Sequence, residues 1–355
     1  MNLENTKIIS IDKIISPKEL KTILPLDTET KNNIIKWRNE IDDIIKGKND
    51  KLIVVIGPCS IHDPTGALDY ASKLKVLCEL FQDKLFIIMR VYFEKPRTTF
   101  GWKGLINDPD LDGSYNINKG LNMAREILLK INQMGIPTGC EFLDVFNPQY
   151  YADLVSWGAI GARTTESQLH RELASGLSMP IGFKNGTNGN IDIAVDAMIC
   201  ANHPHVFMGI NEEGNSSIVK TTGNDGSHII LRGGSNGPNY DHVNISIINK
   251  ILKTKQINTR MIVDCSHGNS GKSYKNQPLV IESVMNQINH GEKNICGVMI
   301  ESNILEGCQK HNVKNGRTGL EYGKSITDEC VNLETSIKML ERMVNKKVHY
   351  FENLC

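Results

Sequence analysis

The run Leu52-Ile53-Val54-Val55-Ile56, followed by Gly57-Pro58-Cys59-Ser60-Ile61-His62, sets the pattern from which the fold can be predicted. Five apolar residues, four of them β-branched, are typical of a strand buried on both faces, and the polar residues behind them mark its carboxyl end. Similar runs predict strands at 85–90, 137–142, 158–162, 180–183, 228–231, 260–263 and 296–300. Amphipathic stretches between them predict helices at about 64–81, 118–134, 147–156, 166–176, 190–202, 241–254, 277–290 and 328–345. Eight strands alternating with eight helices predict an α/β fold, a closed (β/α)8 TIM barrel.

Two segments exceed a minimal barrel. Residues 1–50 form an N-terminal extension with an apolar stretch at 8–15, a helix start at Ser16-Pro17 and a helix near 28–46. The runs 205–210 and 216–220 flank the turn-forming residues 211–215, which predicts a β-hairpin inserted before the sixth barrel strand. We therefore divide the chain into an extension over 1–50, for oligomer contacts or regulation, and a catalytic barrel over 51–355 that carries the hairpin at about 205–220.

Composition narrows the classes of function. The chain has 355 residues, of which 40% are hydrophobic, so it can bury a large core. Lysine and arginine total 40, as do aspartate and glutamate, so the net charge is zero and gives no reason to expect binding to nucleic acid or to a membrane. The sequence shows neither a long apolar span nor a secretory leader, and its nine cysteines lack paired spacings. We expect a cytoplasmic protein with reduced thiols.

Charged residues follow the predicted strands at the end where a parallel barrel carries its active site. A single cation there is usually a solvated surface charge. Several together would repel one another unless anions fill the cavity, so they predict a site for a small, multiply anionic metabolite. The cations are Arg90, Lys95, Arg97, Arg163, Lys184 and Arg232.

A second set combines a thiol, an imidazole and two carboxylates: Cys59, His267, Glu301 and Asp328. Each has an ordinary structural interpretation, such as core packing for Cys59 or a first-turn acid of the last helix for Asp328. Closure of the barrel would bring the four together, which predicts a divalent metal site. Mn²⁺, Fe²⁺, Co²⁺ and Zn²⁺ are all compatible with these donors.

Five motifs carry a resemblance to a known family, at 57–64, 93–99, 161–167, 182–187 and 322–328. Through them the sequence resembles the type I, enterobacterial-style 3-deoxy-D-arabino-heptulosonate 7-phosphate (DAHP) synthases, from about residue 15 to 345. The family condenses phosphoenolpyruvate with erythrose 4-phosphate at the start of the shikimate pathway, as a metal-dependent homodimer or homotetramer.

The resemblance implies a role for each residue of the site. The metal ligands would be Cys59, His267, Glu301 and Asp328. Phosphoenolpyruvate would contact Arg90, Lys95, Arg163, Lys184, Arg232 and, through water, Glu141, whereas erythrose 4-phosphate would contact Pro96, Arg97, Thr98 and Asp328. Ala162 is also expected to bind substrate. We expect catalytic roles for Lys95, Glu141, Lys184, His267 and Asp328. Cys330 lies two residues beyond Asp328, close enough in the chain to approach Cys59, so we expect that oxidation can inactivate the protein through a Cys59–Cys330 disulfide.

The resemblance also implies feedback inhibition by an aromatic amino acid, at Pro148, Gln149, Leu177, Ser178, Phe207 and Gly209. Phenylalanine-sensitive members carry serine where this chain has Gly209, and tyrosine-sensitive members carry glycine, so we expect tyrosine as the inhibitor. An N-terminal acidic pair of the phenylalanine-sensitive members has no counterpart around Asn5 and Thr6. The structural alternative for this cluster is packing beneath the hairpin.

Two other functions stay open. The sister enzyme, 3-deoxy-octulosonate 8-phosphate synthase, shares the barrel and phosphoenolpyruvate but takes a pentose phosphate. A barrel without catalytic activity could also bind phosphorylated metabolites as a sensor. The segment 95–99, the extension and the hairpin favour the heptulosonate enzyme over its sister.

Overall fold

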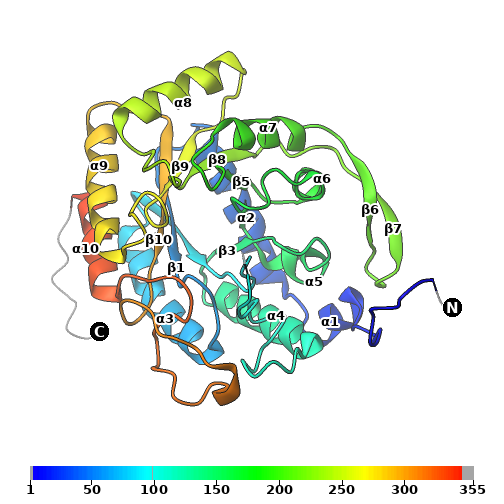
Figure 1. Cartoon of the computed structure of the whole chain (residues 1–355). Coiled ribbons are helices and arrows are strands. Elements are labelled where there is room, and N and C mark those ends of the chain that lie inside the picture. The colour runs from blue at the N-terminus through cyan, green and yellow to red at the C-terminus, as the bar shows by residue number, and fades with distance from the viewer. Residues whose placement is uncertain (1–2, 98, 346–355) are drawn as a thin grey trace.

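Eight parallel strands close into a barrel in the computed structural model of the chain, which describes residues 3–97 and 99–345 (Figure 1). Around the barrel the strands follow the order β1-β10-β9-β8-β5-β4-β3-β2. Their bounds are β1 (Leu52–Gly57), β2 (Leu85–Arg90), β3 (Thr138–Glu141), β4 (Trp157–Ile160), β5 (Ile181–Lys184), β8 (His228–Leu231), β9 (Met261–Asp264) and β10 (Ile295–Glu301). The predicted (β/α)8 fold is confirmed, and each predicted strand agrees with an observed one to within two residues.

Helices cover the outside of the barrel (Figure 1). They are α3 (Pro64–Phe81), α4 (Ile117–Gln133), α5 (Pro148–Tyr151), α6 (Gln168–Gly176), α7 (Asp192–Ala201), α8 (His242–Thr254), α9 (Gln277–Asn289) and α10 (Leu333–Val344). Short 3₁₀ turns follow at η1 (Ala152–Leu154), η2 (Tyr274–Asn276) and η3 (Val313–Asn315). The helix predicted at 147–156 is thus split into α5 and η1.

The prediction that the last helix begins at residue 328 is wrong. It begins at Leu333, where the Asn332 side chain accepts a hydrogen bond from the Thr335 amide as the helix cap. Before that cap the chain is extended, because Cys330 bridges to Gly307 and Val331 to Ser302. Asp328 therefore lies in a loop at the barrel mouth and not in the first turn of a helix.

The barrel interior is a layer of apolar side chains closed at the amino-terminal end by helix α2 (Thr28–Ile45). Ile41, Ile44 and Ile45 of α2 pack against inward-facing residues such as Ile53 and Trp157. In Figure 1, α2 lies across the middle of the ring of strands. With that end plugged by apolar side chains, the polar groups gather at the opposite, carboxyl end.

The extension and the hairpin contact each other. Helix α1 (Pro17–Ile23) begins with the predicted Ser16-Pro17, and Ser16 with Glu19 forms a capping box. Strands β6 (Val206–Ile210) and β7 (Ser216–Lys220) pair antiparallel, which confirms the predicted hairpin. The hairpin extends away from the barrel toward α1 (Figure 1), where the Lys18 amide donates to the Glu212 carbonyl at 2.8 Å. Among the described residues, no helix is both long and apolar enough to cross a membrane.

Candidate active site

A cavity of about 490 Å³ opens at the carboxyl ends of the strands, and we call it the rim cavity. The parallel register brings the strand ends to one level, as where Gly57 of β1 pairs with Glu301 of β10. Most of the residues predicted for the site line this cavity: Arg90, Lys95, Pro96, Arg97, Glu141, Ala162, Arg163, Lys184, Arg232, His267, Glu301 and Asp328. Thr98 lies outside the described residues.

Three of the four predicted metal ligands form a compact cluster. One ligand atom each of Cys59, Glu301 and Asp328 lies within 4.8 Å of the other two, and Cys59 Sγ is 3.6 Å from Asp328 Oδ2. His267 stands beside this cluster, with Nε2 3.9 Å from Glu301 Oε1. A thiol and two carboxylates in one cluster, with an imidazole beside them, are a donor set that fits a divalent metal ion.

Burial and neighbouring charges set the protonation of this cluster. Burial, aided by Glu301, raises the pKa of the Cys59 thiol to about 11. The Lys95 ammonium lies 3.0 Å from Cys59 Sγ. Burial alone would lower the pKa of Lys95, but Cys59 and Glu301 raise it above its ordinary value. Burial would likewise raise the pKa of Asp328, yet Lys95 and His267 bring it below the usual range. Metal binding at neutral pH must therefore displace the thiol proton.

Arg90 forms the floor between the metal cluster and the cationic side of the cavity. Its guanidinium is 1% exposed and donates to Glu301 Oε1 at 2.8 Å and to the Cys59 carbonyl at 3.2 Å. Its Cζ lies 3.7 Å from the centre of the Tyr92 ring, in a cation–π contact. These contacts hold the arginine rigidly, which favours binding of an anion in one orientation.

Lys184, Arg163 and Arg232 also line the cavity. Lys184 is buried, with Nζ 3.4 Å from Asp264 Oδ2 and 3.9 Å from Glu141 Oε2. Burial lowers the pKa of Arg232 below its usual value. The attraction of Asp264 opposes this shift, and the repulsion of Arg163 adds to it. Lys184 is buried, Arg232 is half-buried and Arg163 is exposed, and a group of neighbouring cations of this kind is stabilised by a bound phosphate or carboxylate.

Sequence reasoning assigned no role to two residues that the structure places in this site, Asp264 and Tyr92. Asp264 ends β9 and is fully buried, with Oδ2 2.9 Å from His267 Nδ1. Burial would raise the pKa of Asp264, but His267 and Lys184 hold it well below the usual range. A carboxylate three residues before a candidate histidine ligand is a signal that could have identified it. Tyr92 had no comparable signal, because its contact with Arg90 depends on side-chain packing.

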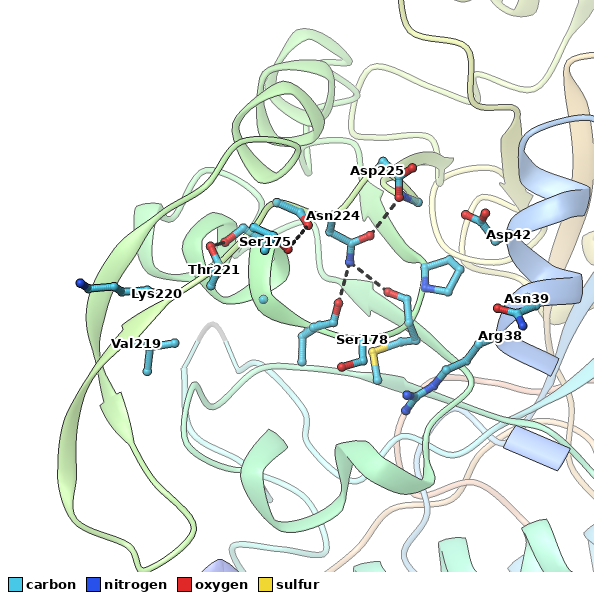
Figure 2. Close-up of a pocket in the computed structure, with 17 residues that line it drawn as sticks. Arg38, Asn39, Asp42, Ser175, Ser178, Val219, Lys220, Thr221, Asn224 and Asp225 are labelled. Atoms are coloured by element: carbon cyan, nitrogen blue, oxygen red, sulfur yellow. Dashed lines mark hydrogen bonds between the residues drawn. The ribbon is translucent and has the colours of Figure 1, made fainter. Parts of the chain in front are cut away.

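A second cavity, also of about 490 Å³, lies beside the hairpin, and we call it the hairpin cavity (Figure 2). Val219 and Lys220 border it on the hairpin side, whereas Arg38 and Asp42 of α2 border it on the other (Figure 2). Between them the Asn224 amide donates to the carbonyl oxygens of Ala174, Leu177 and Met179, at 3.1, 3.0 and 3.0 Å. The wall is therefore held rigidly by buried hydrogen bonds.

Only some of the predicted inhibitor residues meet here. Leu177 and Ser178 line the hairpin cavity. Phe207 pairs with Val219 across the hairpin, and Gly209 shares their half-buried face. Pro148 and Gln149 begin α5 and are not part of the described lining of this cavity. Neither Phe207 nor Gly209 is part of that lining, so the structure brings only Leu177 and Ser178 together at the cavity, with Phe207 next to it through its partner Val219.

A buried contact links α5 with the rim cavity. Glu94, which precedes Lys95, accepts a hydrogen bond from the Asn147 amide at 2.9 Å. Asn147 directly precedes Pro148. Burial, with Asp144 nearby, raises the pKa of Glu94 to about 8. The loop that carries Glu94 and Lys95 is therefore in direct contact with the start of α5.

Comparisons with known proteins agree with this geometry. The profile of the DAHP synthetase I family matches residues 21–341. The phenylalanine-inhibited phospho-2-dehydro-3-deoxyheptonate aldolase of Saccharomyces cerevisiae is 50% identical over 343 residues, covering 96% of this chain and 92% of that protein. The Tyr-sensitive enzyme of Escherichia coli is 49% identical over 341 residues, covering 96% and 95%. A solved structure of the aldolase from Francisella tularensis SCHU S4 superposes with a TM-score of 0.93 at 50% identity, covering 95% of this chain and 98% of that one.

Proposed function

The chain belongs to the DAHP synthetase I family, and we propose that its rim cavity condenses phosphoenolpyruvate with erythrose 4-phosphate and water to give DAHP and phosphate. In this role it is a transferase at the first step of the shikimate pathway. The observation that carries the proposal is one cavity lined both by cations, of which Arg90 and Lys184 are buried, and by carboxylates of the cluster that Glu301 and Asp328 form with Cys59. Mass spectrometry of a reaction with both substrates should detect a seven-carbon keto acid phosphate, and its absence would contradict the proposal.

The bond changes assign a task to each side of the cavity. C3 of phosphoenolpyruvate attacks the aldehyde carbon while water adds at C2, and the tetrahedral intermediate then loses phosphate as the C–O bond breaks. We assign the phosphate to Arg163, Lys184 and Arg232. Holding both reactants in one orientation replaces a bimolecular encounter by a unimolecular step.

Proton movements fall to two further residues. Lys95 keeps its proton against burial, so it can hydrogen-bond or protonate the alkoxide that forms from the aldehyde oxygen. Glu141, whose carboxylate lies 3.9 Å from the Lys184 ammonium, is suited to position the water that adds at C2.

A divalent metal ion, held by Cys59, His267, Glu301 and Asp328, would supply Lewis acidity toward the aldehyde oxygen. The donor set admits Mn²⁺, Fe²⁺, Co²⁺ or Zn²⁺. Elemental analysis of the purified protein, followed by reconstitution with each ion, would identify the native metal.

We further propose tyrosine as the feedback inhibitor, bound between the hairpin and the loop at Leu177 and Ser178. Overall identity does not decide the inhibitor, since a phenylalanine-inhibited and a Tyr-sensitive relative are equally similar to this chain. The local argument is Gly209 on the half-buried face of the hairpin, because glycine would leave more room than serine for a phenolic oxygen there.

We also propose a homodimer or homotetramer built with the extension and the hairpin. Both carry exposed apolar side chains: Ile9 and Ile11 in the extension, and Val206, Met208 and Ile218 on the outer face of the hairpin. Exposed apolar patches of this kind mark interaction surfaces. Analytical ultracentrifugation would measure the size of the assembly, and a monomer at all concentrations would contradict the proposal.

A further inference from the structure

The fully buried carboxylate of Asp264 touches both halves of the rim cavity. Its Oδ2 lies 2.9 Å from His267 Nδ1, on the metal side, and 3.4 Å from Lys184 Nζ, on the phosphate side. Its Oδ1 is occupied within its own turn, where it accepts hydrogen bonds from the Ser266 amide at 3.0 Å and hydroxyl at 2.6 Å. One oxygen thus fixes the turn, while the other faces the two functional side chains.

The same contacts determine which ring nitrogen of His267 carries its proton. His267 Nδ1 lies 2.7 Å from Ser266 Oγ and 2.9 Å from Asp264 Oδ2. Because the Ser266 hydroxyl donates its hydrogen to Asp264, its oxygen is left as an acceptor, and the carboxylate can only accept. The serine oxygen therefore accepts a hydrogen bond from Nδ1, and the negative charge of Asp264 Oδ2, which has no hydrogen-bond partner among the described residues, favours the proton on the same nitrogen. This leaves the lone pair of Nε2 free on the side of Glu301.

We propose that Asp264 is a positioning residue that serves both halves of the reaction, by fixing His267 with Nε2 free for the metal and by holding the Lys184 ammonium in the phosphate site. This inference rests on the proposed function of the rim cavity. A carboxylate behind a ligating histidine fixes the ring and increases its basicity, and loss of such a partner weakens metal binding by roughly 10- to 100-fold.

Direct binding measurements on the full-length protein test the proposal without turnover. Asp264→Asn should weaken the binding of Mn²⁺, measured by the electron paramagnetic resonance signal of the free ion, by about 10- to 100-fold. It should also weaken the binding of phosphoenolpyruvate, measured by calorimetry, by about 10-fold, as expected for loss of a charge-assisted contact. Ser266→Ala removes the hydroxyl contact of His267 Nδ1 but keeps the Oδ2 contacts, so it should weaken Mn²⁺ binding less than Asp264→Asn does and change phosphoenolpyruvate binding by less than about threefold, well below 1.4 kcal/mol.

A double-mutant cycle separates positioning from general damage to the fold. In the His267→Ala background, Asp264→Asn should cause no further loss of Mn²⁺ affinity but should still weaken phosphoenolpyruvate. A change in only one of the two affinities in the single variant would overturn the shared role, as would unchanged values for both.

One measurement needs no variant at Asp264. Nitrogen-15 spectra of histidine-labelled, metal-free protein, with His267 assigned by comparison with His267→Ala, should show Nδ1 protonated and Nε2 bare. Protonation on Nε2 would overturn the inference. If the wild type binds both ligands but forms no DAHP, the proposed function fails while these binding results still decide the role of Asp264.

Discussion

Replacement of Gly209 by serine should weaken inhibition by tyrosine selectively. The backbone at Gly209 does not adopt the left-handed conformation that favours glycine, so space alone limits the substitution. A Cβ at this position would lie 2.9 Å from Val219 Cγ2, closer than side chains normally approach. The serine must therefore push Val219 aside or open the hairpin, at a cost of about 1–3 kcal/mol.

The loss of tyrosine binding has a second cause. A serine side chain would take the space that we assign to the phenolic oxygen, and a phenol buried without a partner costs about 1–3 kcal/mol. At about 1.4 kcal/mol per decade this corresponds to roughly 5- to 150-fold weaker inhibition by tyrosine. Phenylalanine lacks the phenolic oxygen, so its inhibition should weaken less or improve.

The assay is a titration of tyrosine, phenylalanine and tryptophan against phosphate release by the wild type, Gly209→Ser, and Gly209→Ser combined with Val219→Ala. Truncation of Val219 removes the close contact, so the double variant should recover thermal stability but keep the weakened response to tyrosine. The reasoning is refuted if phenylalanine or tryptophan is the strongest inhibitor of the wild type. It is also refuted if tyrosine inhibits Gly209→Ser as strongly as the wild type, since the predicted inhibitor residues would then only pack beneath the hairpin.

Three further predictions concern the metal, the anion site and pH. Chelation should abolish activity, and addition of a divalent ion should restore it. Cys59→Ala should lower the metal affinity, measured by metal titration, because it removes one of four ligands. Full activity of protein shown to be free of metal would contradict this prediction. Lys184→Ala and Arg163→Ala should each raise the KM for phosphoenolpyruvate by roughly 10- to 100-fold, about 1.5–3 kcal/mol, with far less effect on the KM for erythrose 4-phosphate. Equal effects on both KM values would show that the cations are wrongly assigned to the two substrates. Burial lowers the pKa of His228 from 6.5 to about 4. Between these pH values the unfolded chain binds a proton that the native state does not, so the free energy of unfolding, measured by chemical denaturation, should fall by about 3 kcal/mol as the pH drops. A flat profile, matching that of His228→Gln, would contradict this prediction.

The sequence was sufficient to predict the barrel, because its parallel strands are buried on both faces and therefore appear as continuous apolar runs. The polar residues after those runs indicated the rim cavity for the same reason, since parallel strands end at one level. The start of α10 was predicted wrongly. Asp328 was a plausible first-turn acid, and only the pairing of Cys330 and Val331 with distant loops shows that the helix begins later, at Leu333.

Contacts between strands lay beyond sequence reasoning. The approach of Asp264 to Lys184 joins β9 with β5, and the contact of Arg90 with Tyr92 depends on how one side chain folds over the other. The proposed pairing of Cys59 with Cys330 stays a prediction, since both are buried, free thiols in the structure.

The most direct measurement of the central claim is phosphate release by the purified, metal-loaded protein from phosphoenolpyruvate in the presence of different aldehyde substrates. We predict rapid release with erythrose 4-phosphate, little with a pentose 5-phosphate, and none without an aldehyde. Equal or faster release with the pentose phosphate would identify the sister octulosonate enzyme. No release with any aldehyde, from protein shown to contain its metal and to bind phosphoenolpyruvate, would contradict the assignment of the rim cavity as a catalytic site.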